Sequence, residues 1–203
     1  MNKLIFLDID GVLNGHESHG NGYCGTRPDC VARFNRILSA TGAAIVVSSA
    51  WRYLVLSGSM TIVGLENLLL SHGVDCREKI RDVTRPDVGD EMRGLQISLW
   101  LKSRKFPPDA YVVLDDMDDI SAYGHPFVRT ESKTGLTDED ADRAIAILMG
   151  GVQKPSSWSA PDIAGVLAVQ KPLRRWRAYD GSYRWGAAFG LDAEGRIPYT
   201  PEG

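Results

Sequence analysis

Two aspartates one residue apart, Asp8 and Asp10, follow an apolar run near the start of the chain. Residues 4–7 predict a strand that is buried on both faces, so the two carboxylates stand at its carboxyl end. Burying acids is costly unless a cation or a reaction needs them. A hard cation such as Mg²⁺ binds one or two carboxylates together with water and phosphate oxygens. Gly11 permits a sharp turn and lets a ligand approach the backbone.

The two carboxylates suit different steps of one reaction. Asp8 could attack a phosphoryl group, because a carboxylate can form an aspartyl-phosphate. Asp10 is close enough in the chain to protonate a leaving group and then to activate water. The alternative is a calcium-binding or structural pair of acids in a loop. The Gly11-Val12 pair that follows the acids favours the catalytic interpretation.

A second apolar run, residues 45–47, ends in Ser48 and Ser49. Hydroxyl and backbone N–H groups at a strand end could hold phosphate oxygens. A serine after a strand also commonly acts as a cap or turn residue. Arg52 follows closely and could contact phosphate or substrate, or it could be a solvated arginine at a helix start. Ser48, Ser49 and Arg52 are therefore candidate substrate-binding residues.

A third apolar run, residues 111–114, ends in Asp115-Asp116, with Asp118 and Asp119 close behind. Four neighbouring acids repel one another unless a cation or solvent separates them. A cation or solvent is therefore expected beside Asp115 and Asp116. Asp118 and Asp119 are expected in a solvated loop, with support of the metal's surroundings as the alternative.

These motifs together resemble those of the haloacid dehalogenase (HAD) superfamily of phosphatases. Residues 6–14, FLDIDGVLN, resemble its first motif, DxDGV; the run ending at Ser48 resembles the second, and Asp115-Asp116 the fourth. The resemblance implies that Asp8 is the nucleophile and Asp10 the general acid/base. It also implies a Mg²⁺ cofactor held by Asp8, by the main-chain carbonyl of Asp10 and by the Asp115-Asp116 pair.

The third motif of this family needs a cation at a helix start between the second and fourth motifs. The candidates are Lys79, Arg81, Arg85 and Arg93. We favour Arg93, because its place ahead of the strand at 110–115 resembles a HAD branch found with nucleic-acid end-repair enzymes, including polynucleotide 3′-phosphatases. Arg93 stands where the superfamily more often has Lys, and a surface helix charge is the alternative. The resemblance covers about residues 3–149.

Apolar strands alternate with amphipathic helices through most of the chain. Strands are expected at residues 3–8, 43–48, 110–115 and 126–129, and helices at residues 28–42, 62–73, 91–102 and 137–150. This alternation predicts an α/β fold with a doubly wound, mostly parallel sheet, in line with the HAD-like Rossmannoid core that the resemblance implies. Ligands of such sheets bind beyond the carboxyl ends of the strands. No insertion is long enough for a large cap.

The composition changes after residue 151. We predict a phosphatase domain at residues 1–151 and a small β-rich extension at residues 152–203, packed on the domain. Turn signals at residues 180–181 and 194–195 suggest hairpins. The cations and aromatic residues of the segment 174–185 could stack bases and hold phosphates, but a packed hairpin is favoured.

Bulk properties narrow the classes of protein. The net charge of −3 gives no overall basic field of the kind that indicates nucleic-acid binding. No apolar stretch is long enough to span a membrane. An odd number of cysteines, with no signal peptide in view, suits free thiols in the cytoplasm. His16, His19, Cys24 and Cys30 could form a zinc site, but their irregular spacing favours a loop over the active site.

The sequence therefore predicts a cytoplasmic, Mg²⁺-dependent phosphomonoester hydrolase that acts through an aspartyl-phosphate. Its substrate would be a phosphorylated small molecule, a nucleotide or a nucleic-acid 3′-phosphate end; no membrane partner is expected, and no protein partner can be assigned. The alternative is a non-catalytic protein that uses the same fold to sequester a phosphorylated small molecule or nucleotide. A third interpretation is an interaction module whose C-terminal extension docks a partner.

Overall fold

The computed structural model describes residues 2–14, 25–86, 92–150, 175–177 and 183–185. Five strands form one sheet in the order β3-β2-β1-β4-β5, and every neighbouring pair is parallel. The strands are β1 (Lys3–Leu7), β2 (Ala44–Val47), β3 (Ile80–Val83), β4 (Ala110–Asp115) and β5 (Phe127–Arg129). The sheet confirms the predicted α/β fold with a HAD-like Rossmannoid core.

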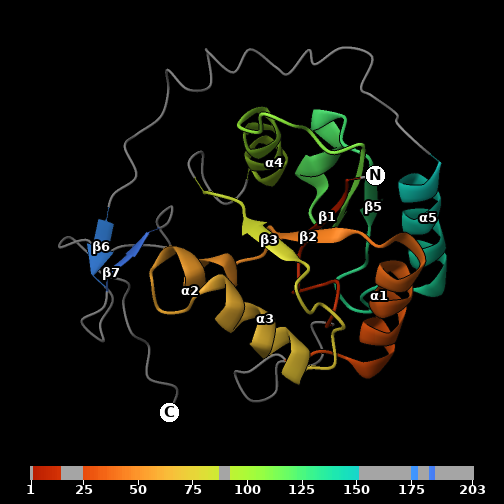
Figure 1. Ribbon diagram of the computed structural model, residues 1–203, viewed down its shortest axis with the longest axis horizontal. Helices are drawn as coiled ribbons and strands as arrows, with labels where there is room; N and C mark the ends of the chain where they lie inside the picture. The colour runs from red at the N-terminus through yellow and green to blue at the C-terminus, as the bar shows by residue number, and fades with distance from the viewer. Residues whose placement is uncertain (1, 15–24, 87–91, 151–174, 178–182, 186–203) are drawn as a thin grey trace.

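Helices cover both faces of the sheet (Figure 1). One face packs on α1 (Pro28–Thr41), α3 (Ile62–Ser71) and α5 (Asp138–Met149), and the other on α4 (Arg93–Lys102). Alternate residues of β1 serve the two faces: Ile5 and Leu7 belong to the larger core, Leu4 and Phe6 to the core under α4. Because both faces are covered, the three central strands β1, β2 and β4 are continuous apolar runs in the sequence.

Local sequence signals set the ends of the helices. Pro28 is the first residue of α1, where its missing N–H costs nothing, and Gly42 ends the helix at a φ of 63°. Before α5, the Thr137 hydroxyl accepts a hydrogen bond from the N–H of Asp140, whose carboxylate accepts one from the N–H of Thr137. This capping box begins α5 where the sequence predicted a cap.

The sequence interpretation missed three elements: β3, the short helix α2 (Arg52–Leu56) and the 3-10 helix η2 (Asp118–Tyr123), where it expected a solvated loop. The stretch that contains β3 has no clear period because polar residues interrupt it. Arg81 is exposed, and the carboxylate of Asp82 accepts hydrogen bonds from the Trp100 indole and from Arg104, both at 2.9 Å. A strand at the edge of a sheet can carry such residues, whereas a central strand cannot.

Two further strands lie in the C-terminal segment. β6 (Arg175–Arg177) and β7 (Tyr183–Trp185) pair antiparallel and flank the turn predicted at residues 180–181. The turn predicted at residues 194–195 lies outside the described residues. The domain boundary after residue 151 stays a prediction.

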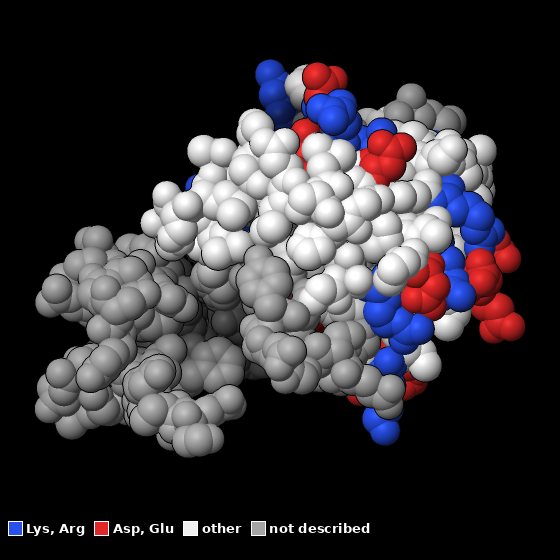
Figure 2. Space-filling view, turned by 90° about the horizontal axis from the view of Figure 1, so that it is seen from below, with Lys and Arg blue, Asp and Glu red and all other residues white. Residues whose placement is uncertain are grey.

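Opposite charges alternate along the flank formed by α1 and α5, on the right of Figure 2. Arg33 lies 3.0 Å from Asp138, and Arg36 contacts both Asp138 and Asp142. Such exposed pairs contribute little individually, and their mixture leaves no field of a single sign on this flank. In the described part of the chain, no helix has the length and apolar character that crossing a bilayer requires.

Candidate active site

β1 is the central strand, so its carboxyl end lies between those of β2 and β4. Asp8 continues the strand by one residue, since its N–H donates to the carbonyl of Leu114 at 2.9 Å, and its side chain is buried. The chain then turns at Gly11, which has a φ of 85°. Asn14 closes the turn: its Oδ1 accepts from the N–H of Gly11 at 2.9 Å, and its Nδ2 donates to the Asp10 carboxylate at 2.8 Å.

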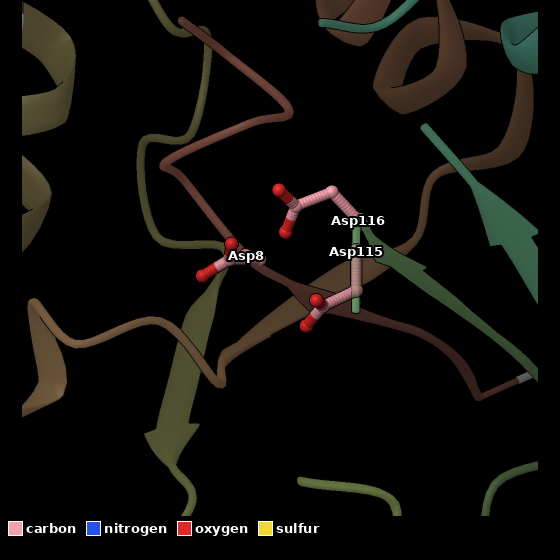
Figure 3. Close-up of side chains that lie close together, drawn as sticks. All are labelled: Asp8, Asp115 and Asp116. Atoms are coloured by element: carbon pink, nitrogen blue, oxygen red, sulfur yellow. The ribbon is translucent and has the colours of Figure 1, made fainter. Parts of the chain in front are cut away.

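The carboxylates of Asp8, Asp115 and Asp116 converge at this end of the sheet (Figure 3). One oxygen from each lies within 4.8 Å of the others. Asp115 is fully buried and accepts a hydrogen bond from the N–H of Met117 at 3.0 Å, while Asp116 accepts one from the Ser132 hydroxyl at 2.5 Å. Both acids are therefore held in place by neighbouring groups.

Arg93 joins two of these acids. Its Nη1 lies 2.8 Å from Oδ1 of Asp8 and 2.8 Å from Oδ2 of Asp115, and all three side chains are buried. Gly94, the residue after Arg93, holds the start of helix α4 in place through two contacts. Its N–H donates to the Asp119 carboxylate at 2.8 Å, and its carbonyl oxygen lies 2.8 Å from Nε2 of His125. Arg93 is thus the candidate cation that the structure brings to the acids.

Burial governs the electrostatics of this group. It raises the pKa of Asp8 to about 7; Arg93 opposes the shift, and the neighbouring acids, Asp115 first, add to it. Burial also raises the pKa of Asp115, again against the positive charge of Arg93. The same burial disfavours the charged guanidinium, but the attraction of Asp8 and Asp115 prevails and raises the pKa of Arg93. Arg93 therefore stays charged beside two acids that it only partly compensates.

The donor set fits a divalent cation. When all are ionised, the carboxylates of Asp8, Asp115 and Asp116 and the single guanidinium of Arg93 leave two uncompensated negative charges. Carboxylate oxygens are also the ligands that Mg²⁺ prefers. The Asp10 carboxylate is not part of this group of three acids, and the role of its main-chain carbonyl as a ligand stays a prediction.

The candidate substrate-binding residues after β2 are all buried, but they differ in their hydrogen bonding. Ser48 is fully buried, and in the described part of the chain its Oγ has no hydrogen-bond partner. Oγ of Ser49 accepts from the N–H of Trp51 at 3.3 Å. Arg52 is also fully buried, and its Nη1 donates to the carbonyls of Ser48 and Ser49. Arg52 thus supports the loop, and its contact with substrate stays a prediction.

Sequence reasoning missed the supporting residues Asn14, Ser132 and His125. Only Asn14 carried a signal, since an asparagine just after a glycine turn often bonds to nearby backbone. The zinc hypothesis is untested, because His16, His19 and Cys24 lie outside the described residues. Cys30, the fourth candidate ligand, is buried, with its Sγ 3.5 Å from the carbonyl oxygen of Thr134.

A parallel sheet with an Asp-x-Asp-Gly turn on its central strand and an acidic pair on the adjacent strand defines a HAD-like α/β domain. Residues 4–141 match the family described as the HAD domain in Swiss Army Knife RNA repair proteins. The match spans more than half of the chain, and the chain belongs to this family. Comparisons with curated proteins and with solved structures gave no match. Membership of the family supports HAD-type phosphatase or hydrolase chemistry.

Proposed function

We propose that this protein is a Mg²⁺-dependent phosphomonoesterase in which Asp8 carries the phosphoryl group between two half-reactions. The observation that supports this most strongly is the buried group of Asp8, Asp115 and Asp116 with Arg93 bridging two of them. A structural acid pair needs no such cluster, whereas phosphoryl transfer needs a nucleophile, a cation site and a fixed positive charge in one place.

In the first half-reaction, an Asp8 carboxylate oxygen attacks phosphorus and forms the aspartyl-phosphate. The bond from phosphorus to the ester oxygen breaks, and Asp10 gives its proton to that departing oxygen. Asp10 is half-buried at the turn, and Asn14 fixes its carboxylate through the 2.8 Å hydrogen bond from Nδ2. The Asp10 side chain is thus held near Asp8 without joining the acidic cluster.

In the second half-reaction, Asp10 takes a proton from water, and the resulting hydroxide attacks phosphorus. The bond from phosphorus to the Asp8 oxygen breaks, which releases inorganic phosphate and regenerates both aspartates. Arg93 and the Ser48 hydroxyl would bind the phosphoryl oxygens in both steps. Mg²⁺, held by Asp8, Asp115, Asp116 and the Asp10 carbonyl, would supply charge neutralisation for the phosphoryl group.

The proposed substrates are nucleotides or nucleic-acid ends that carry a 3′-phosphate. The family description, with its reference to RNA repair, supports this choice. The size of the connections agrees with it, because only residues 8–27 separate β1 from α1, and α2 and α3 fill the path from β2 to β3. An active site without a large cap can admit a polymer end.

The test compares phosphate release from para-nitrophenyl phosphate, nucleoside 3′- and 5′-monophosphates, and 3′- or 5′-phosphorylated oligonucleotides, with Mg²⁺ or EDTA. We expect Mg²⁺-dependent turnover that prefers 3′-phosphates and that Asp8→Asn abolishes. Asp142→Asn, at an exposed acid on α5, is the matched control and should keep full activity. Stoichiometric binding of a nucleotide with no release in single-turnover assays would favour the sequestering alternative.

A further inference from the structure

The polar row at the carboxyl edge of the sheet extends one strand beyond the residues considered so far. The strand hydrogen bonding continues past the ends of the strands: the N–H of Asp8 donates to Leu114, that of Ser48 to Leu7, and that of Thr84 to Val47, each at 2.9 Å. Thr84 therefore stands beside Ser48 as Ser48 stands beside Asp8. The order across the sheet is Thr84, Ser48, Asp8, Asp115.

A bulge in β3 brings Thr84 into this row. Ile45 pairs with Ile80, but the next residue, Val46, pairs with Asp82, so Arg81 is the extra residue. The shift turns Asp82 toward α4, where it accepts from the Trp100 indole, and keeps Val83 in the opposite core. Without the bulge, Val83 would stand beside Ser48. Bulges next to active sites commonly re-aim a side chain in this way.

The Thr84 hydroxyl is a second buried polar group at the end of the sheet. The residue is fully inaccessible, and in the described part of the chain its Oγ1 has no hydrogen-bond partner. Ser48 Oγ, on the adjacent strand, has the same property. A buried hydroxyl without a partner costs about 1–3 kcal/mol, so two of them side by side at the end of the sheet indicate a place for a ligand.

We propose that Thr84 is a substrate-specificity residue whose hydroxyl binds an oxygen of the substrate's alcohol portion, beside the transferred phosphoryl group. The proposal rests on the proposed phosphatase function. Adjacent strands lie about 4.8 Å apart, so Thr84 is roughly 10 Å from Asp8 along the row. A phosphoryl group on Asp8 reaches Ser48 on the next strand, but not the strand after that.

For a nucleoside 3′-phosphate, the oxygen closest to the phosphate is the ribose 2′-hydroxyl. A threonine hydroxyl can donate to it or accept from it. The proposed cation site, formed by Asp8, Asp115 and Asp116, lies on the side of Asp8 away from Ser48 and Thr84, so it leaves the β3 side free for the sugar. The substrate class that fits this arrangement is a phosphate ester with a vicinal hydroxyl.

The test is Thr84→Val, which replaces the hydroxyl with a methyl group of the same shape, with Thr84→Ser as the variant that keeps the hydroxyl. Thr41→Val is the matched control, because Thr41 is a buried threonine at the end of α1 whose hydroxyl is already bonded to the carbonyl of Ile37. The measured quantity is the ratio of kcat/KM for a ribonucleoside 3′-phosphate to that for para-nitrophenyl phosphate. We expect roughly a ten-fold fall in Thr84→Val, the size of one hydrogen bond, and an unchanged ratio in Thr84→Ser and Thr41→Val.

With the wild-type protein, kcat/KM for a 2′-deoxynucleoside 3′-phosphate should already be lower than for the ribonucleoside 3′-phosphate, because the 2′-hydroxyl is missing. An equal loss on all three substrates in Thr84→Val would overturn the proposal, because it would place Thr84 on the phosphoryl group itself; an unchanged ratio would also overturn it. Calorimetric binding of the ribonucleoside 3′-phosphate to wild type and Thr84→Val separates the two proposals. If the wild-type protein shows no turnover but Thr84→Val binds the nucleotide more weakly, the phosphatase proposal is refuted and the contact between Thr84 and the ligand is supported.

Discussion

Gly11 and Asp116 lie so close together that a Cβ atom on Gly11 would stand 2.6 Å from Oδ2 of Asp116. Gly11 is fixed on both sides: its N–H donates to Asn14, and its carbonyl accepts from the Thr130 hydroxyl at 2.7 Å. The glycine of the Asp-x-Asp-Gly turn therefore has a second purpose beyond its φ of 85°. It leaves the space in which Asp116, an acid of the proposed cation site, stands.

Replacing Gly11 with Ala should displace the Asp116 carboxylate and weaken Mg²⁺ binding at least ten-fold. The backbone strain should also lower the free energy of unfolding by about 1–2 kcal/mol. Gly58→Ala is the matched control, because Gly58 has a φ of 76° but, among the residues that the structure describes, no atom within 4 Å of its missing Cβ. Gly58→Ala should lower the free energy of unfolding without lowering the Mg²⁺ affinity. Calorimetric titration of Mg²⁺ into both variants measures the difference in affinity. Equal Mg²⁺ affinity in Gly11→Ala and wild type would refute this account of the turn.

Arg93→Met should be costly because it leaves Asp8 and Asp115 buried with no cation between them. Breaking such a buried pair typically lowers the free energy of unfolding by about 3–5 kcal/mol. Arg129→Met removes an exposed arginine that pairs with Asp118, and it should cost less than about 1 kcal/mol. Urea unfolding of the two variants measures both values. Similar small losses in both would mean that the buried contacts of Arg93 with Asp8 and Asp115 contribute no more to stability than an exposed ion pair.

Mg²⁺ should stabilise the folded protein through Asp116. At a hundred times its dissociation constant, a ligand of the folded state adds about 2.7 kcal/mol, so the Tm of the wild type should rise on addition of Mg²⁺. Asp116→Ala should abolish most of the rise, while Asp118→Ala, two residues away and paired with Arg129, should preserve it. A rise of the same size in Asp116→Ala would remove Asp116 from the ligands.

Stability without Mg²⁺ should fall as the pH rises toward neutrality. Burial raises the pKa of Asp8 to about 7, whereas an unfolded aspartate titrates near 4. Between these values the folded protein holds a proton that the unfolded chain has released, so the Asp8 contribution is complete below about pH 4 and is lost by about pH 7. The amide of Asp8→Asn cannot titrate, so the free energy of unfolding of this variant should lack the decrease that Asp8 causes between about pH 4 and pH 7.

The comparison with Asp8→Asn is needed because His125 acts in the opposite sense. Burial lowers the pKa of His125, so its contribution is lost as the pH falls below about 6.5. It is common to both proteins and cancels in the difference. Urea unfolding at several pH values in EDTA gives the difference curve, which should be flat above about pH 7 and should change below it. A flat curve throughout would show that Asp8 titrates normally.

The residues at the site could be anticipated from the sequence because they follow apolar runs directly. Once β1, β2 and β4 are placed in one parallel sheet, Asp8, Ser48 and Asp115 must meet at the same edge. Helices α1 and α5 could be predicted equally well, since Pro28, Gly42 and Thr137 are strong end signals.

The remaining features depend on contacts between distant segments. Arg93 was chosen among four cations only through a resemblance, and nothing in its local sequence shows that it would bridge Asp8 and Asp115. The bulge at Arg81 exists only in the pairing of β3 with β2, so the position of Thr84 left no trace in the periodicity. His125 bonds to Tyr111 and to the carbonyl of Gly94, a network formed by tertiary packing alone.

The most direct test of the central proposal is to identify the residue that carries the phosphoryl group. The protein would be mixed with Mg²⁺ and its best substrate, quenched within one turnover and treated with borohydride, which reduces an aspartyl-phosphate to homoserine. Peptide mass spectrometry then locates the change. The account predicts homoserine at position 8, dependent on both substrate and Mg²⁺ and absent from Asp8→Asn. Phosphate release with no reduction at position 8, or with reduction at another acid, would contradict it.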